Sequence, residues 1–168
     1  NTHYALVFNK DIKTNNPTVR IHSSCLTGDL MGSQKCDCGY QLETAIDYMS
    51  KSKNMSILIY LNQEGRGLGI HNKIISYNIQ EKGWDTYQAD NILGFSGDER
   101  DYKAAAEILN FFKVKKLNLI TNNPEKVEYL EKNKITVKKI IKIKPGINPH
   151  NKKYLETKKI IGKHLLNL

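Results

Sequence analysis

The sequence predicts an α/β fold, with a mixed sheet and helices on both faces, as a single layered α/β/α domain over residues 1–168. Short apolar segments of strand length alternate along the chain with longer segments of helical periodicity. Several strand-like segments lead into a helix through a turn rich in glycine or asparagine, which is typical of layered α/β proteins. A chain of 168 residues matches one domain whose core needs no disulfides.

The first half of the chain supplies three predicted strands. Tyr4–Phe8 and Thr18–Ser23 are joined by a polar turn, so we expect a hairpin-like pair that makes the sheet mixed. Met55–Leu61 is apolar almost throughout, as in a buried strand. The other predicted elements are a helix over Gly39–Lys51, a glycine-rich turn over Glu64–Gly69, and a helix over Ile70–Lys82 that Gly83 ends.

The second half continues the alternation. Asn123 is suited to cap a helix that has Pro124 at its first position. In order, the predicted elements are a loop over Asn91–Gly97, a helix over Asp101–Phe112, a strand over Lys116–Ile120, a helix over Pro124–Asn133, a strand over Ile135–Ile143, a turn over Lys144–His150, and a lysine-rich helix over Asn151–Leu166.

The composition excludes several classes of protein. No apolar run approaches the roughly 20 residues that span a bilayer, and nothing resembles a secretion signal. Three cysteines are an odd number and too few for a disulfide scaffold. We therefore expect a soluble protein of the cytoplasm that has no membrane partner.

The net charge of +9 is unevenly distributed. Residues 1–112 carry 11 basic and 13 acidic side chains, whereas residues 113–168 carry 15 lysines and four glutamates. A basic half can attract nucleic acid or polyphosphates, and it can equally be a solvated lysine surface. Neither a zinc-finger pair nor an aromatic-interleaved platform accompanies the lysines, so we expect no nucleic-acid partner.

Arginine is scarce, because only Arg20, Arg66 and Arg100 accompany 23 lysines. The arginines are therefore candidates for phosphate or carboxylate recognition, which needs a planar and permanently charged group. The alternative is that the three arginines have no special role and simply remain in a sequence that is biased toward lysine.

Three polar junctions precede predicted helices, at Gln63–Gly69, Asp98–Asp101 and Thr121–Lys126. Backbone N–H groups at such helix starts can face an anion, and in an open α/β sheet the junctions would converge on one crevice. Taken alone, each junction is also compatible with an ordinary turn. Gln63–Gly69 has neither a G-x-G-x-x-G pattern nor a P-loop lysine, so dinucleotide and Walker chemistry do not follow.

All the thiols lie near one another in sequence, at Cys25, Cys36 and Cys38. Metal ligation explains this grouping better than a disulfide, and soft thiolates select zinc or iron–sulfur clusters. A cluster normally takes four thiolates, whereas zinc with three protein ligands and an open fourth position is typical of a catalytic site. Two alternatives stay open: His22 closes a structural site, or the three cysteines are unrelated buried residues.

Five motifs together resemble the GTP cyclohydrolase II family over about residues 18–166. They are Arg20–Asp29 (RIHSSCLTGD), Cys36–Gly39 (CDCG), Gln63–Gly69 (QEGRGLG), Gly94–Tyr102 (GFSGDERDY) and Thr121–Pro124 (TNNP). The resemblance implies a hydrolase that opens the imidazole ring of GTP at the start of riboflavin biosynthesis. It releases formate from C8 and pyrophosphate, and leaves 2,5-diamino-6-ribosylamino-pyrimidinone 5′-phosphate. One Zn²⁺ per chain and a homodimer are implied, and the triphosphate calls for Mg²⁺.

The same resemblance implies roles for individual residues. The zinc ligands match Cys25, Cys36 and Cys38. Asp98 matches the general base and Arg100 the proposed nucleophile at the α-phosphorus, while Tyr77 matches a tyrosine tied to completing the reaction at C8. The GTP-contacting positions match Arg20, Ile21, His22, Ser23, Ser24, Gln41, Glu64, Gly65, Arg66, Thr86, Thr121 and Lys126. Ser24 departs from the family, which commonly has Glu at that position.

Two roles can be examined chemically. A guanidinium is normally always protonated, so Arg100 would need Asp98 or another base beside it to act as a nucleophile, and transition-state charge stabilisation is the milder role. Glu64 is the candidate reader of guanine, because a carboxylate can accept both N1–H and the 2-amino group.

Three further hypotheses for the whole chain stay open. The chain could be a nucleotide-binding paralogue without catalysis, a fragment of a two-enzyme chain, or a basic zinc module that binds nucleic acid.

Overall fold

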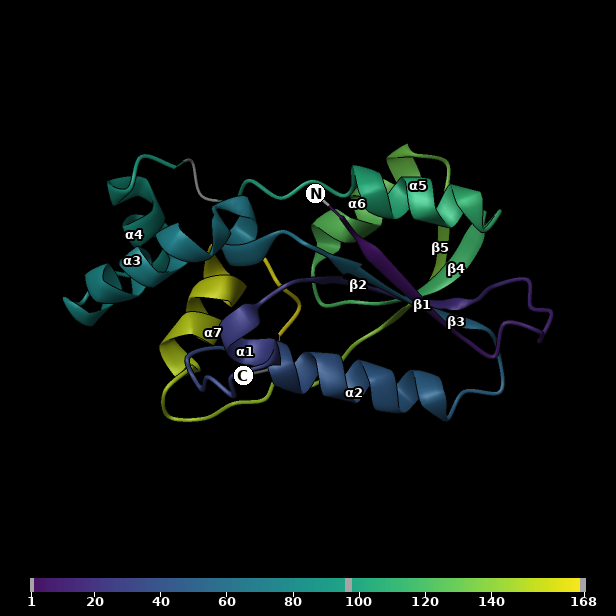
Figure 1. Ribbon diagram of the computed structural model, residues 1–168, viewed down its shortest axis with the longest axis horizontal. Helices are drawn as coiled ribbons and strands as arrows, with labels where there is room; N and C mark the ends of the chain where they lie inside the picture. Colours follow the sequence, from purple (N-terminus) through teal and green to yellow (C-terminus); the bar gives the residue numbers. More distant parts are fainter. Residues whose placement is uncertain (1, 96–97, 167–168) are drawn as a thin grey trace.

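The computed structural model describes residues 2–95 and 98–166, and its centre is a five-stranded sheet (Figure 1). The strands are β1 (Tyr4–Phe8), β2 (Thr18–Ser23), β3 (Ser56–Leu61), β4 (Lys116–Ile120) and β5 (Thr136–Ile141). Their spatial order is β1-β3-β2-β4-β5, and β1 is antiparallel to β3 while the other pairs are parallel. The predicted mixed sheet is therefore confirmed.

The predicted pairing of the first two strands is wrong. β1 pairs with β3, with Tyr4 opposite Tyr60 and Phe8 opposite Ser56, and β2 lies between β3 and β4. The physical reason is burial. The first five residues of β2 are buried, as expected for a strand with neighbours on both sides, whereas β1 is mostly exposed and suits an edge.

The helices are α1 (Leu26–Asp29), α2 (Cys38–Ser50), α3 (Gly69–Glu81), α4 (Thr86–Ile92), α5 (Lys103–Phe111), α6 (Pro124–Lys132) and α7 (Lys152–Ile160), with a 3₁₀ turn η1 (Glu64–Gly67). The sequence analysis did not predict α1 or α4. The C-terminal helix ends at Ile160 instead of Leu166. Of the predicted loop Asn91–Gly97, residues 96–97 lie outside the described residues.

Helices cover both faces of the sheet, as predicted (Figure 1). On one face Ile57 and Ile59 pack with Leu109 of α5 and Leu130 of α6. On the other face Leu58 packs in a second cluster with residues of α2. This division follows from the alternation of side chains along a strand. Among the described residues, no helix is both long and apolar enough to cross a bilayer.

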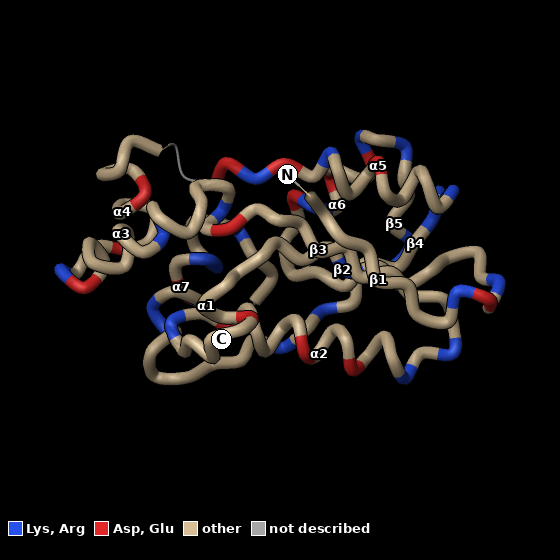
Figure 2. The backbone as a smooth tube through the Cα atoms, in the orientation of Figure 1, with Lys and Arg blue, Asp and Glu red and all other residues tan. Residues whose placement is uncertain are grey.

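A third group of helices lies beyond the carboxyl ends of the parallel strands β2 and β3. Figure 1 shows α1, α3, α4 and α7 gathered there, away from α5 and α6. Basic positions are spread along the backbone at both ends of the molecule, and they do not form one stripe in the view of Figure 2. The edge of the sheet at the strand ends is where ligands bind in open α/β sheets.

Candidate active site

The three cysteines converge at this edge of the sheet. Their Sγ atoms lie within 4.8 Å of one another, and the Sγ atoms of Cys25 and Cys36 are 3.6 Å apart. Cys25 lies between β2 and α1, Cys36 lies in the loop before α2, and Cys38 begins α2. In the described part of the chain, this is the one group of three or more Cys, His, Asp or Glu ligand atoms close enough to hold a metal ion.

The surroundings of the thiols fit a metal ion of zinc type. A Cβ on residue 28 would lie 2.8 Å from Cys36 Sγ and 3.0 Å from Cys25 Sγ, so only glycine leaves room for the three sulfurs. Thiolate donors select zinc or iron–sulfur clusters, and a cluster normally takes four. Cys25, Cys36 and Cys38 are therefore the residues that could hold zinc.

His22 is not a member of the cysteine group. Its Nε2 lies 3.0 Å from Asp29 Oδ2, and its ring stacks on Tyr60 at a centroid distance of 5.5 Å. Asp29 Oδ2 also accepts hydrogen bonds from Tyr60 OH at 2.8 Å and from the Cys25 backbone N–H at 3.0 Å. The alternative in which His22 closes the metal site is therefore not supported, and this buried network instead fixes the backbone of Cys25.

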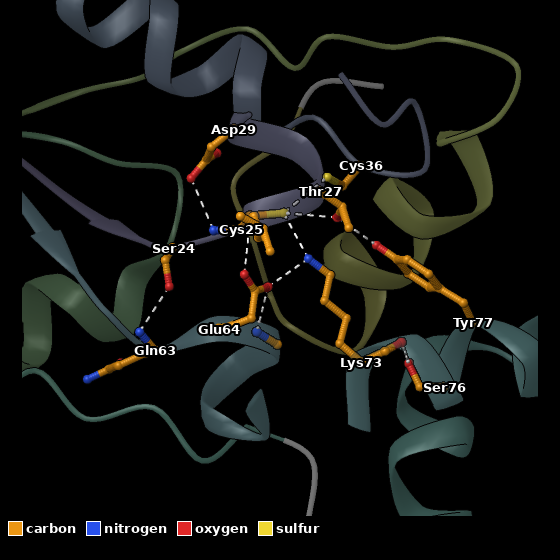
Figure 3. Close-up of polar contacts among 12 residues, drawn as sticks. Ser24, Cys25, Thr27, Asp29, Cys36, Gln63, Glu64, Lys73, Ser76 and Tyr77 are labelled. Carbon is orange, nitrogen blue, oxygen red and sulfur yellow. Dashed lines mark hydrogen bonds and ion pairs between the residues drawn. The ribbon is translucent and has the colours of Figure 1, made fainter. Parts of the chain in front are cut away.

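A lysine that the sequence analysis missed lies against the thiols (Figure 3). Lys73 Nζ is 3.0 Å from Cys25 Sγ and 2.7 Å from Glu64 Oε1. Hydrogen bonds from Cys36 and Cys38, with a further contribution from Lys73, hold the pKa of the Cys25 thiol far below its usual range. The thiolate form that metal ligation requires is thus favoured at Cys25.

Glu64 ties the glycine-rich turn to the cysteine loop. Its Oε2 accepts a hydrogen bond of 2.5 Å from the Leu26 backbone N–H, and its Oε1 accepts from Lys73 and from the Gly65 N–H at 3.0 Å (Figure 3). A carboxylate has about four lone-pair sites, and three are already in use. These contacts do not test guanine recognition by Glu64, which would require at least one of the bonds to be exchanged. The bonds themselves favour a role for Glu64 in the wall of the cavity.

Tyr77 reaches the cysteine loop from α3, one turn after Lys73. Its hydroxyl lies 3.2 Å from Thr27 Oγ1 (Figure 3). Burial raises the pKa of this phenol, so the hydroxyl keeps its proton and can donate it in a hydrogen bond. The tyrosine assigned by resemblance is therefore close to the thiols.

Arg66 is turned toward α4. Gly65 and Arg66 both have positive φ, at 60° and 59°, which reverses the chain within η1. Arg66 then donates a 2.9 Å hydrogen bond to Asp90 and stacks on the Tyr87 ring, with Cζ 4.2 Å from its centroid. A short helix that the sequence analysis missed thus holds one of the three arginines.

Arg100 pairs with Asp98 through Nε at 2.7 Å and through a second contact from a terminal nitrogen. Burial alone would lower the pKa of the guanidinium, but the hydrogen bonds to Asp98 and the charges of Tyr102, Asp98 and Tyr154 together outweigh it and hold this pKa above its ordinary value. The same pairing outweighs burial at Asp98 and lowers the pKa of its carboxyl group. The pair is fully charged in this state.

Several predicted site residues do not line the cavity. Arg20 donates to Gln41 Oε1 at 2.7 Å, and Lys126 donates to the Ile21 carbonyl at 2.8 Å. The Ile21 side chain is part of the core, and Thr121 is buried at the end of β4. Arg20, Ile21, His22, Gln41, Asp98, Thr121 and Lys126 are not among the residues that line the cavity.

One cavity collects the other predicted residues. These are Ser23, Ser24, Cys25, Cys36, Cys38, Glu64, Gly65, Arg66, Tyr77, Thr86 and Arg100. Nine further lining residues were not predicted individually as site residues, although Gln63 and Leu68 belong to the Gln63–Gly69 motif. The nine are Lys35, Gln63, Leu68, Lys73, Ser76, Gln80, Asp90, Tyr154 and Lys158. Lys73 precedes Tyr77 by four positions, so helical spacing alone could have placed it on the same face.

Proteins of known name resemble this chain over most of its length. Residues 1–142 match the family model described as GTP cyclohydrolase II. A protein named GTP cyclohydrolase-2 from Helicobacter pylori (strain P12) is 51% identical over 152 residues, which cover 90% of this chain and 77% of that protein. Proteins of the same name are 50% identical over 157 residues in Psychromonas ingrahamii, covering 93% and 78%, and 45% identical over 166 residues in Blochmanniella floridana, covering 98% and 82%.

Proposed function

Because this chain belongs to the GTP cyclohydrolase II family of enzymes, we propose that it hydrolyses GTP by opening the imidazole ring. The products are formate, pyrophosphate and 2,5-diamino-6-ribosylamino-pyrimidinone 5′-phosphate, in the first step of riboflavin biosynthesis. Residues 1–168 form one catalytic domain of a cytoplasmic homodimer, with one Zn²⁺ per chain and Mg²⁺ bound with the triphosphate.

The observation that carries the proposal is the shared cavity of the thiols, Tyr77 and Arg100. GTP hydrolysis of this kind needs two reacting places, at C8 of the base and at the α-phosphate. The cavity offers a thiolate metal centre for the first and a half-buried, charged guanidinium for the second. Such a pairing of chemistries in one cavity is more specific than either feature alone.

The metal end suits reaction at C8. When bound, zinc supplies Lewis-acid chemistry that makes water a competent nucleophile near neutral pH. Asp29 holds the backbone of Cys25, and Lys73 contacts its thiol. The Tyr77 hydroxyl contacts Thr27 at the same end of the cavity. From there it can donate a hydrogen bond to the base while C8 is released as formate.

The arginine end suits charge stabilisation at the phosphates. Arg100 is held protonated by Asp98, so in this state it has no lone pair with which to attack phosphorus. A fixed guanidinium stabilises the charge that develops as pyrophosphate leaves. The geometry therefore favours this milder role for Arg100, and Asp98 acts by orienting it.

The experiment is an assay of the zinc-loaded protein with GTP and Mg²⁺. Formate and pyrophosphate should appear together, stop when a zinc chelator strips the metal, and return when zinc is restored. Binding of GTP without either product would indicate a non-catalytic paralogue. Absence of GTP turnover, together with nucleic-acid binding that weakens steeply with salt, would indicate a nucleic-acid-binding module.

A further inference from the structure

The C-terminal helix reaches the cavity although it lies outside the part of the chain that matches the family model. That match ends at residue 142, and α7 spans Lys152–Ile160. Two of its side chains, Tyr154 and Lys158, line the same cavity as Arg100 and the cysteines. The two residues are four positions apart, which places them on one face of the helix.

Contacts on both sides of α7 fix its place. Before the helix, the buried Asn151 donates to the Gly146 carbonyl at 2.7 Å, and Leu155 is completely buried one turn later. After the helix, the Leu165 backbone N–H donates to the Asn122 carbonyl at 2.9 Å, next to the end of β4. The segment is therefore docked on the body of the protein, and its cavity-facing side chains have a defined direction.

Lys158 places a positive charge in the cavity, and the carboxylate of Asp37 neutralises it only in part. The Lys158 side chain is 14% exposed, and Nζ lies 3.6 Å from Asp37 Oδ1, beyond the usual 2.7–3.2 Å of a hydrogen bond. Asp37 directs its other oxygen to Gln41 at 2.6 Å. Nζ also lies 4.5 Å from the centre of the Tyr154 ring, which supports the ammonium from one side.

Burial alone would lower the pKa of Lys158, but Tyr154, Asp37 and Cys38 outweigh it and raise this pKa, so Lys158 stays charged. Its charge in turn acts on other cationic side chains nearby. After burial, the charges of Arg20, Arg100 and Lys158 are the next largest influences that lower the pKa of Lys126. Burial, followed by Lys158, Arg100 and Lys126, likewise lowers the pKa of His164 to about 3. Cations that disfavour one another in this way form a ready site for a polyanion.

We propose that Lys158 binds the triphosphate of the substrate and that Tyr154 holds its ammonium in position, so that α7 is part of the active site. This inference rests on the proposed function for the identity of the substrate. The affinity of an ammonium group for a chain of phosphates can be measured without turnover of GTP.

The test measures binding of inorganic triphosphate and of guanosine to the zinc-loaded protein by calorimetry. Lys158→Met should weaken triphosphate binding about tenfold and leave guanosine binding and zinc content unchanged. Lys158→Arg, which keeps the charge, should keep most of the affinity. Lys159→Met is the matched control, because it removes an exposed lysine from the next position of the same helix.

Three results would overturn the inference. The first is equal triphosphate affinity in the Lys158 and Lys159 variants. The second is a loss of guanosine affinity in Lys158→Met as large as its loss of triphosphate affinity, and the third is loss of zinc. Either of the last two would mean that Lys158 supports Asp37 instead of binding phosphate. Should Lys158→Met fail to fold, Lys158→Gln replaces it. Formate release by the wild type is assayed in parallel. If triphosphate binding depends on Lys158 but the wild type releases no formate from GTP, the result contradicts the proposed function and leaves this inference standing.

Discussion

Lys73 of α3 donates a 2.7 Å hydrogen bond to Glu64, and its ammonium also lies 3.0 Å from Cys25 Sγ. Both side chains of this ion pair are nearly buried. Three thiolates around a divalent ion leave one net negative charge, which a lysine in this position offsets. Lys73 therefore links the metal centre to the glycine-rich turn.

Lys73→Met should weaken zinc binding by about 10- to 100-fold, the usual cost of losing a residue that supports metal ligands. Competition against a chelator of known affinity measures the effect. Lys82→Met removes an exposed lysine at the end of the same helix and serves as the control. Zinc affinity in Lys73→Met equal to that of Lys82→Met would show that Lys73 does not support the metal centre.

Glu64→Gln should reduce kcat/KM for GTP and ITP by the same factor. Its carboxylate already accepts from Leu26, Gly65 and Lys73, so the substitution damages the cavity wall irrespective of the base. ITP lacks the 2-amino group, and reading that group is worth roughly 1–3 kcal/mol. A loss for GTP at least tenfold larger than that for ITP would assign guanine recognition to Glu64.

Arg100→Ala should slow pyrophosphate release by about 100- to 1,000-fold, the usual cost of removing one group that stabilises developing charge. Zinc content should stay unchanged, because Arg100 pairs with Asp98 and not with a thiol. The rate of pyrophosphate release by Arg100→Lys should fall between those of the wild type and Arg100→Ala, since the substitution keeps the charge and loses the planar fork. A near-normal rate in Arg100→Lys would contradict the role of the guanidinium.

Stability should fall as the pH drops below about 6.5, in part through His164. Burial and the neighbouring charges of Lys158 and Arg100 lower its folded pKa to about 3. Between these values the unfolded chain binds a proton that the folded chain does not, which costs at most about 1.4 kcal/mol per pH unit.

His164→Gln should therefore flatten the dependence of the free energy of unfolding on pH between pH 6.5 and 4. Urea titrations across this range measure it, with the exposed His150→Gln as the control. Identical slopes in the two variants would mean that His164 is not protected from protonation.

The fold shows which structural information is local in the sequence. The apolar run of β3 and the cap formed by Asn123 predicted their elements directly. The pairing of β1 with β3 depends on contacts distant in sequence, so nearness along the chain wrongly favoured β2 as its partner. Helix α4 was predictable, because Asp85 and Gln88 form a capping box that is visible as D-x-x-Q.

In the candidate site, too, some features could be predicted from neighbouring residues in the sequence, and others depend on distant contacts. The cysteine spacing predicted a metal group that the structure brings together. The sequence could not show that His22 turns to Asp29, since that contact depends on how β2 meets α1. Nor could it show that Lys158 reaches the cavity, because this depends on where α7 docks, and a lysine-rich helix is usually a solvated surface.

Zinc content and formate release, measured on the same samples of wild type and Cys36→Ser, test the central claim most directly. The wild type should contain about one zinc per chain and release formate from GTP. Cys36→Ser should lose both together while its circular dichroism stays that of a folded protein, because serine is a poor zinc ligand. Full turnover by a folded Cys36→Ser protein would contradict the assignment of the three cysteines to a catalytic metal.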